Sequence, residues 1–223
     1  MYEHEILTYT AYVNATARLD RARLMARRPR SEMISETRAK LIAAGRHAFA
    51  TRGYADAAAE DLTAEAGLTR GALYHHFGGK PGLLEAVIAQ IDMEISERLR
   101  AVVEKAGTPW DGFVEECIAW IELALDPEIR RIVLLDGPAV LGDPARWPSH
   151  GACLAGTMTS IETLIGQGTL KDVDPEATAH LVNGAALNVS LWIASAEDPQ
   201  AASEQAIPAF RELLLGLRKD DVT

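Results

Sequence analysis

The sequence has little of what metal-binding and catalytic proteins need. It has only two cysteines, Cys117 and Cys153, which lie far apart and without any metal-ligand spacing, so we expect free thiols in the core rather than a disulfide or redox switch. It has no glycine-rich phosphate loop, and neither His150 nor His180 finds the partners of a Ser/His/Asp or metal arrangement. We therefore predict no catalytic residue, no metal site and no cofactor.

The sequence also lacks a long apolar run. Its most apolar window, residues 181–196, is uncharged but includes two asparagines and two serines, and it is slightly too short to span a membrane. The N-terminus begins acidic and polar, without the early apolar run of a signal peptide. We therefore expect a cytoplasmic protein without a membrane partner.

The 223 residues carry an uneven charge. With 48% apolar and 24% charged residues, the composition is that of an ordinary globular protein. Residues 1–80 hold 12 Lys and Arg against 9 Asp and Glu, whereas residues 81–223 hold 10 against 23. Because phosphate repels an acidic surface, any nucleic acid has to bind the first part.

Residues 58–80 give the strongest pattern in the chain. Residues 58–66 predict a short helix that ends at Gly67, a residue type that accepts the left-handed conformation. Thr69 can cap a second short helix over residues 70–77. Two short helices joined by a tight glycine turn predict a helix-turn-helix motif over residues 58–77, whose second helix enters the major groove of DNA.

The surrounding residues resemble a known family. Thr37-Arg38, Gly53-Tyr54, the run from Ala66 to Gly71, the run from Leu73 to Phe77, and Lys80 match the N-terminal domain of TetR-type (tetracycline-repressor-like, TetR/AcrR) transcriptional regulators. The chain departs from the family at residues 57–58, where alanines replace hydroxyl residues that often contact phosphate. Asp56 can cap this helix but repels phosphate.

The resemblance and the side-chain chemistry together nominate residues that contact DNA. Arg70 can reach guanine or phosphate, and Tyr74 and His75 are long enough for phosphate. Small side chains at Gly71 and Ala72 let the helix lie deep in the groove. The predicted DNA-binding residues are Thr69, Arg70, Gly71, Ala72, Tyr74, His75, His76 and Lys80.

Residues 1–35 precede the family match and are rich in arginine. Six arginines crowd the second half of this extension: Arg18, Arg21, Arg23, Arg27, Arg28 and Arg30. A basic arm beside a DNA-binding domain favours phosphate or minor-groove contact. A solvated tail, or a translation start at Met25 or Met33, is an equally good interpretation.

The helical periodicity predicts an all-α fold with three parts. These are the extension (residues 1–35), a three-helix DNA-binding head (residues 36–80), and a helical ligand-binding and dimerisation domain (residues 81–223). We expect the first helix of the head over residues 36–52 and a long fourth helix from Lys80 to about Gly107, which links head and body. Later helices are expected over residues 110–125, and after the pairs Asp126-Pro127, Asp143-Pro144, Asp174-Pro175 and Asp198-Pro199. The residues Asp136-Gly137-Pro138 are expected to break the sixth helix.

The sequence of the body predicts a ligand-binding cavity and a dimer interface. An apolar cavity with few polar groups is the usual make-up of a small-molecule site, and its candidate lining residues are Phe113, Trp120, Trp147, His150, Met158 and Trp192. The eighth and ninth helices, after Asp174 and Asp198, have broader apolar faces than one chain can bury. The family resemblance implies that they pair across a two-fold axis in a homodimer.

These features predict a sequence-specific transcriptional regulator. Its partners would be a pseudo-palindromic double-stranded DNA operator, a second copy of the chain, and a small apolar or aromatic effector that releases it as a repressor. The alternative is a helical small-molecule-binding protein or enzyme with an incidental helix-turn-helix-like corner. Binding to duplex DNA that weakens steeply with salt separates the two.

Overall fold

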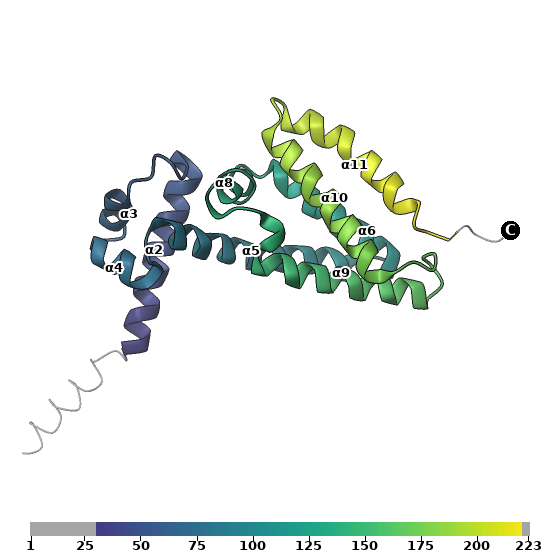
Figure 1. The fold of residues 1–223 in the computed structure, drawn as a ribbon, viewed down its shortest axis with the longest axis horizontal. Coiled ribbons are helices and arrows are strands. Elements are labelled where there is room, and N and C mark those ends of the chain that lie inside the picture. The colour runs from purple at the N-terminus through teal and green to yellow at the C-terminus, as the bar shows by residue number, and fades with distance from the viewer. Residues whose placement is uncertain (1–29, 220–223) are drawn as a thin grey trace, which may run out of the picture. The chain divides into compact units, whose positions relative to one another are not determined.

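The computed structural model describes residues 30–219, which are almost wholly helical (Figure 1). The chain divides after Lys40 into two units, and helix α2 (Arg30–Arg52) runs through this division. Within the first unit, the Thr37 hydroxyl donates to the Met33 carbonyl at 2.8 Å and Lys40 pairs with Glu36 at 3.0 Å. Within the described residues, this helix already includes the six residues before the predicted start at Glu36. The domain boundaries at residues 35–36 and 80–81 stay predictions.

The second unit begins with the rest of α2 and the helix-turn-helix. Helices α3 (Ala59–Glu65) and α4 (Arg70–Phe77) follow, within one residue of the predicted bounds. Leu41, Phe49, Leu62 and Leu73 are fully buried together, so each of these three helices contributes to one apolar core. The same core continues along one face of α5 (Lys80–Lys105).

Three of the four Asp-Pro pairs open an α-helix, as predicted, whereas Asp143-Pro144 opens only a short 3₁₀ turn and the next α-helix begins at Pro148. The aspartates of all four pairs accept hydrogen bonds from backbone amides of the first turn, at 2.7–3.3 Å, while the prolines occupy positions that need no amide donor. The elements that follow are α7 (Pro127–Ile129), the 3₁₀ turn η3 (Pro144–Arg146), α10 (Pro175–Ser195) and α11 (Pro199–Leu215).

The predicted break at residues 136–138 is wrong. The chain continues from α7 into a π-helix, η2 (Arg130–Asp136), and then directly into α8 (Gly137–Leu141). The Gly137 amide donates to the carbonyl of Ile132, five residues back. Pro138 has no amide to donate, and the wider π turn lets the backbone remain helical across it.

The remaining helices complete the body. Helix α6 (Pro109–Glu122) ends in the 3₁₀ turn η1 (Leu123–Leu125), and α9 (Pro148–Gly166) follows η3. Helices α6, α9, α10 and α11 pack together (Figure 1). Their shared core includes Phe113, Ile121, Ile161, Ile193 and Phe210. In residues 30–219 the only β pairing is a single bridge between Leu170 and Arg218, so the predicted all-α class is confirmed.

The sequence predicts free cysteines and no membrane-spanning helix. Cys117 and Cys153 are both free, as predicted, but Cys153 is exposed and does not lie in the core. Within the part of the chain that the structure describes, no helix combines the length and apolar character needed to cross a membrane.

Candidate functional site

The turn before α4 and the caps at its two ends hold this helix in place. Gly67, with φ of 65°, makes the left-handed turn after α3, which a side chain would strain. The Thr69 hydroxyl then accepts from the Ala72 amide at 3.4 Å, as the predicted N-cap does. At the other end Gly78 caps the helix with φ of 70° and donates its amide to the Tyr74 carbonyl. Both ends of this eight-residue helix are therefore fixed by its own sequence.

Most of the predicted DNA-binding residues are accessible to solvent. Thr69, Arg70, Gly71, Tyr74 and His75 are exposed, whereas Ala72, His76 and Lys80 are partly buried. Leu73, by contrast, is fully buried and anchors α4 to the core. Small residues thus lie beside longer hydrogen-bonding side chains on the exposed face, an arrangement that can enter a major groove.

Arg70 is held by neighbours on its own domain. Its guanidinium pairs with the Glu60 carboxylate of α3 at 2.7 Å, and both side chains are about 60% exposed. It also donates to the Tyr74 hydroxyl at 3.4 Å, and its Cζ lies 5.5 Å from the centroid of that ring. Solvent screens a pair this exposed, so it contributes little to stability, and a DNA phosphate can replace Glu60 as the partner.

Lys80, at the first position of α5, is positioned by the loop before α3. Its ammonium lies 4.2 Å from the Tyr54 ring centroid and donates to the Ala55 carbonyl at 3.4 Å. The sequence did not identify Tyr54 as this support. The start of α3 also differs from expectation, since Ala58 is its N-cap and no side chain, Asp56 included, caps it.

The predicted ligand-lining residues do not share one cavity. Trp120 lines a small apolar space of about 10 Å³, which is bounded mainly by α5, η1, α7 and η2 and by Ser190 of α10. Phe113 and Met158 pack in the core of α6, α9, α10 and α11. Trp192 is 49% exposed on α10. Of these four, only Trp120 borders the space.

The other two predicted lining residues lie near the start of α9. Trp147 packs against the core of the head and α5, and its indole Nε1 is buried without a hydrogen-bond partner among residues 30–219. His150 is partly buried in the first turn of α9. Trp147 therefore offers an unused donor inside the protein.

An arginine of α2 joins the head to the body. Arg46 donates to both Glu94 oxygens of α5, at 2.6 and 2.9 Å, and to both Glu128 oxygens of α7, each at 2.8 Å. These hydrogen bonds hold the pKa of Arg46 well above its usual value, Glu128 contributing most. In return, Arg46 lowers the pKa of the Glu94 carboxyl.

A second contact joins the end of α2 to the π-helix. The Arg131 guanidinium donates to the Arg52 carbonyl at 2.8 Å, and the Asp136 carboxylate accepts from the Tyr54 amide at 2.8 Å. Gly53, between these two backbone groups, has φ of 85°, and a Cβ there would lie only 2.3 Å from the Arg131 guanidinium. Glycine therefore suits position 53, because a side chain there would collide with the Arg131 guanidinium.

Two carboxyls and one thiol, that of Cys117, are partly buried in the body. Burial raises the pKa values of Asp92 and Glu116, although a hydrogen bond from Ser149 opposes the shift at Asp92. Burial, followed by the neighbouring Glu116 and Cys153, raises the pKa of Cys117 to about 12. That thiol is protonated at neutral pH and unreactive, in keeping with a packing role.

Sequence comparison matches both halves of the chain to one family. Residues 41–87 match the tetR family of bacterial regulatory proteins, and residues 110–217 match the tetracyclin repressor-like C-terminal domain. A crystal structure of a TetR-family transcriptional regulator from Pectobacterium atrosepticum is 48% identical, with a TM-score of 0.80 over 86% of this chain and 99% of that one.

Two regulators from Pseudomonas putida are similar over a shorter length. TtgR is 34% identical over 110 residues, 48% of this chain and 52% of TtgR. SrpR is 43% identical over 115 residues, 51% of this chain and 52% of SrpR. Both are described as HTH-type transcriptional regulators. The chain thus matches about half the length of these curated relatives.

Proposed function

This chain belongs to the TetR family of bacterial regulatory proteins, and from that premise we propose that it binds operator DNA as a homodimer and is released by a small-molecule effector. The observation that carries the proposal is the exposed face of α4, where Arg70, Tyr74 and His75 surround Gly71 above the buried Leu73. Members of this family are transcriptional regulators, not enzymes, which argues against the alternative of an incidental helix-turn-helix corner.

Fluorescence anisotropy with duplex DNA tests DNA binding. We expect selection from a random pool to enrich a pseudo-palindrome, because two heads related by a dyad read two related half-sites. Affinity for that duplex should fall steeply as salt rises, with a slope of about 0.9 for each phosphate neutralised. Failure to enrich any duplex, or affinity independent of salt, would contradict the proposal.

A stripe on α10 supports the homodimer. Leu181, Gly184, Asn188 and Trp192 are all exposed and recur at three- and four-residue steps, so they lie on one face. Leu181 is 73% exposed, and an apolar stripe of this kind is typical of an interaction surface.

Helix α11 adds Gln205, Ala209 and Leu213, which are exposed at four-residue steps. Helices α10 and α11 pack against each other, and we propose that their two stripes form one dimer interface. Asn188 is its polar member. Asn183 is already engaged with α9, since it accepts from the Thr157 hydroxyl at 3.0 Å.

The effector site we propose is the space beside Trp120. At about 10 Å³ it barely admits a water molecule, whereas small-molecule pockets measure roughly 300–1,000 Å³. We infer that an effector has to widen this space in order to bind. The apolar walls of the space, with Ser190 as the polar residue of the lining, suit an apolar or aromatic effector.

The walls of this space explain how an effector can reach the head. Ile129, Val133 and Leu134 line it from α7 and η2. The same short segment also contacts the head. Glu128 accepts hydrogen bonds from Arg46, and Arg131 and Asp136 bind backbone groups of the turn after α2. An effector large enough to open the space therefore has to displace residues whose neighbours hold the DNA-binding head. The effector can shift the equilibrium between the two positions of that segment only by the difference in its affinity for them.

A further inference from the structure

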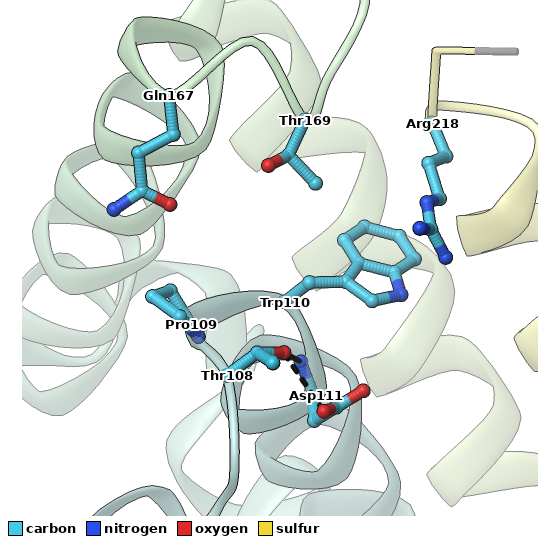
Figure 2. A pocket seen from close by; sticks show the side chains of 7 residues that line it. All are labelled: Thr108, Pro109, Trp110, Asp111, Gln167, Thr169 and Arg218. Carbon is cyan, nitrogen blue, oxygen red and sulfur yellow. Dashed lines mark hydrogen bonds between the residues drawn. The ribbon is translucent and has the colours of Figure 1, made fainter. Parts of the chain in front are cut away.

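A second cleft lies at another end of the body, away from the residues around Trp120. Its volume is about 340 Å³, and its walls are the first turn of α6 (residues 108–111), Gln167 and Thr169 from the loop between α9 and α10, and Arg218 after α11 (Figure 2). Three segments distant in the sequence thus meet around one space. The volume falls in the range of small-molecule sites.

Backbone pairing fixes the wall that carries Arg218. The Lys171 amide donates to the Leu217 carbonyl and the Lys219 amide to the Thr169 carbonyl, both at 2.9 Å. The Lys171 ammonium also donates to the Gly216 carbonyl at 2.7 Å. The two backbone bonds form the bridge between Leu170 and Arg218, and together with the ammonium bond they hold the Arg218 backbone opposite the α9–α10 loop.

The lining combines an aromatic ring with a cation. The Trp110 indole is only 8% exposed and therefore rigidly packed, and Figure 2 shows it between the α6 turn and Thr169, with the Arg218 side chain pointing toward it. The Arg218 Cζ lies 6.0 Å from the indole centroid. Among residues 30–219, no carboxylate forms an ion pair with Arg218, so its guanidinium can accept an anionic partner.

The remaining lining groups limit the charge of a ligand. The side chains of Gln167 and Thr169 make no hydrogen bond within the described range, and both lie at the cleft. Asp111 also lines it, and its carboxylate accepts from the Thr108 hydroxyl at 2.8 Å. A carboxylate in the lining repels a multiply charged anion such as phosphate, whereas a monoanion on the guanidinium is tolerated.

We propose that this cleft binds a small aromatic monocarboxylate. The planar guanidinium of Arg218 matches the two oxygens of a carboxylate. The ring packs against Trp110, and Gln167, Thr169 or Asp111 bonds to a polar substituent. The site is separate from the proposed effector space, so ligand binding here can be tested independently of DNA binding.

Calorimetry on the full chain tests this site with 4-hydroxybenzoate as the probe. We expect the acid to bind at least about tenfold more tightly than the neutral 4-hydroxybenzamide, because only the acid pairs with the guanidinium. Arg218→Gln should weaken binding of the acid about tenfold and leave the amide unchanged. Arg100→Gln, which alters an exposed arginine of α5 outside the cleft, serves as the matched control.

The location is tested by the indole N–H resonance of Trp110, assigned by its disappearance in Trp110→Phe. It should shift on addition of the acid in wild-type protein, and that shift should weaken in Arg218→Gln. The absence of binding, equal affinity for acid and amide, or equal effects of Arg218→Gln and Arg100→Gln would overturn the proposal. Circular dichroism of each variant excludes loss of folding as the cause.

Discussion

Replacing Arg46 by methionine should destabilise the protein by breaking the link between α2, α5 and α7. The arginine makes four hydrogen bonds of 2.6–2.9 Å to two carboxylates, and its side chain is only 21% exposed. Its loss should cost more than the 0–1 kcal/mol of a typical surface pair, but less than the roughly 3–5 kcal/mol of a fully buried one, because Glu94 and Glu128 remain partly solvated. We expect about 2 kcal/mol, or a Tm lowered by about 4–8 °C.

Urea denaturation followed by circular dichroism measures this loss, with Arg98→Met as the control. Arg98 pairs with Asp126 at 3.8 Å in a more exposed setting, so its removal should change stability by about 0.5 kcal/mol or less. A double-mutant cycle with Glu128→Gln should give a coupling energy of about 1 kcal/mol. Equal effects of Arg46→Met and Arg98→Met would refute the assigned role of Arg46.

The pH dependence gives a second check on the same variant. Arg46 lowers the pKa of Glu94 in the folded protein, so the resulting stability is present above the unfolded-state pKa of about 4.3. It is lost as pH falls through the lowered folded-state value. The gap between wild type and Arg46→Met should therefore be full near neutral pH and narrow below about pH 4. A gap that stays constant into acid would contradict this assignment.

Three further changes give simple outcomes. Glu60→Gln frees Arg70 and removes a negative charge near DNA, so operator affinity at low salt should rise by about threefold in anisotropy titrations; unchanged or weaker binding would argue against the exchange of Glu60 for phosphate. Leu213→Glu should yield monomers by sedimentation, because a charge cannot be buried in the proposed interface, whereas a dimer would place the interface elsewhere. Asp92→Asn should raise the Tm near neutral pH, because the raised folded-state pKa of Asp92 means that folding disfavours its charged form there. That advantage should shrink as pH falls through the raised pKa and wild-type Asp92 becomes protonated, and a difference independent of pH would exclude this cause.

Local signals in the sequence predicted much of the fold. An Asp-Pro pair contains both a capping carboxylate and a proline that needs no donor, so it marks a helix start without reference to distant residues. The turn at Gly67 and the Thr69 cap were predictable for the same reason. The continuity through Gly137-Pro138 was not, because it depends on π-type bonding that no local preference encodes.

The interactions between head and body could not be predicted from the sequence. Arg46 and Glu128 are 82 residues apart, and nothing in the pattern near either residue indicates the other. Aromatic residues were also poor guides to a pocket: Trp120 borders a cavity but Trp192 lies on the surface, and helical periodicity alone does not distinguish these environments. Arg18, Arg21, Arg23, Arg27 and Arg28 of the predicted arm lie outside the described residues, so arm and tail remain alternatives.

The central claim is that the exposed face of α4 contacts operator DNA. The most direct measurement compares wild type, the double variant Arg70→Gln/Tyr74→Ala, and the control Arg100→Gln by anisotropy against one operator at several salt concentrations. The double variant should bind more weakly at every salt concentration, and its slope of log affinity against log salt should fall by about 0.9 for each phosphate that it no longer neutralises. Arg100→Gln should match wild type. A double variant whose affinity and slope equal those of wild type would contradict the claim.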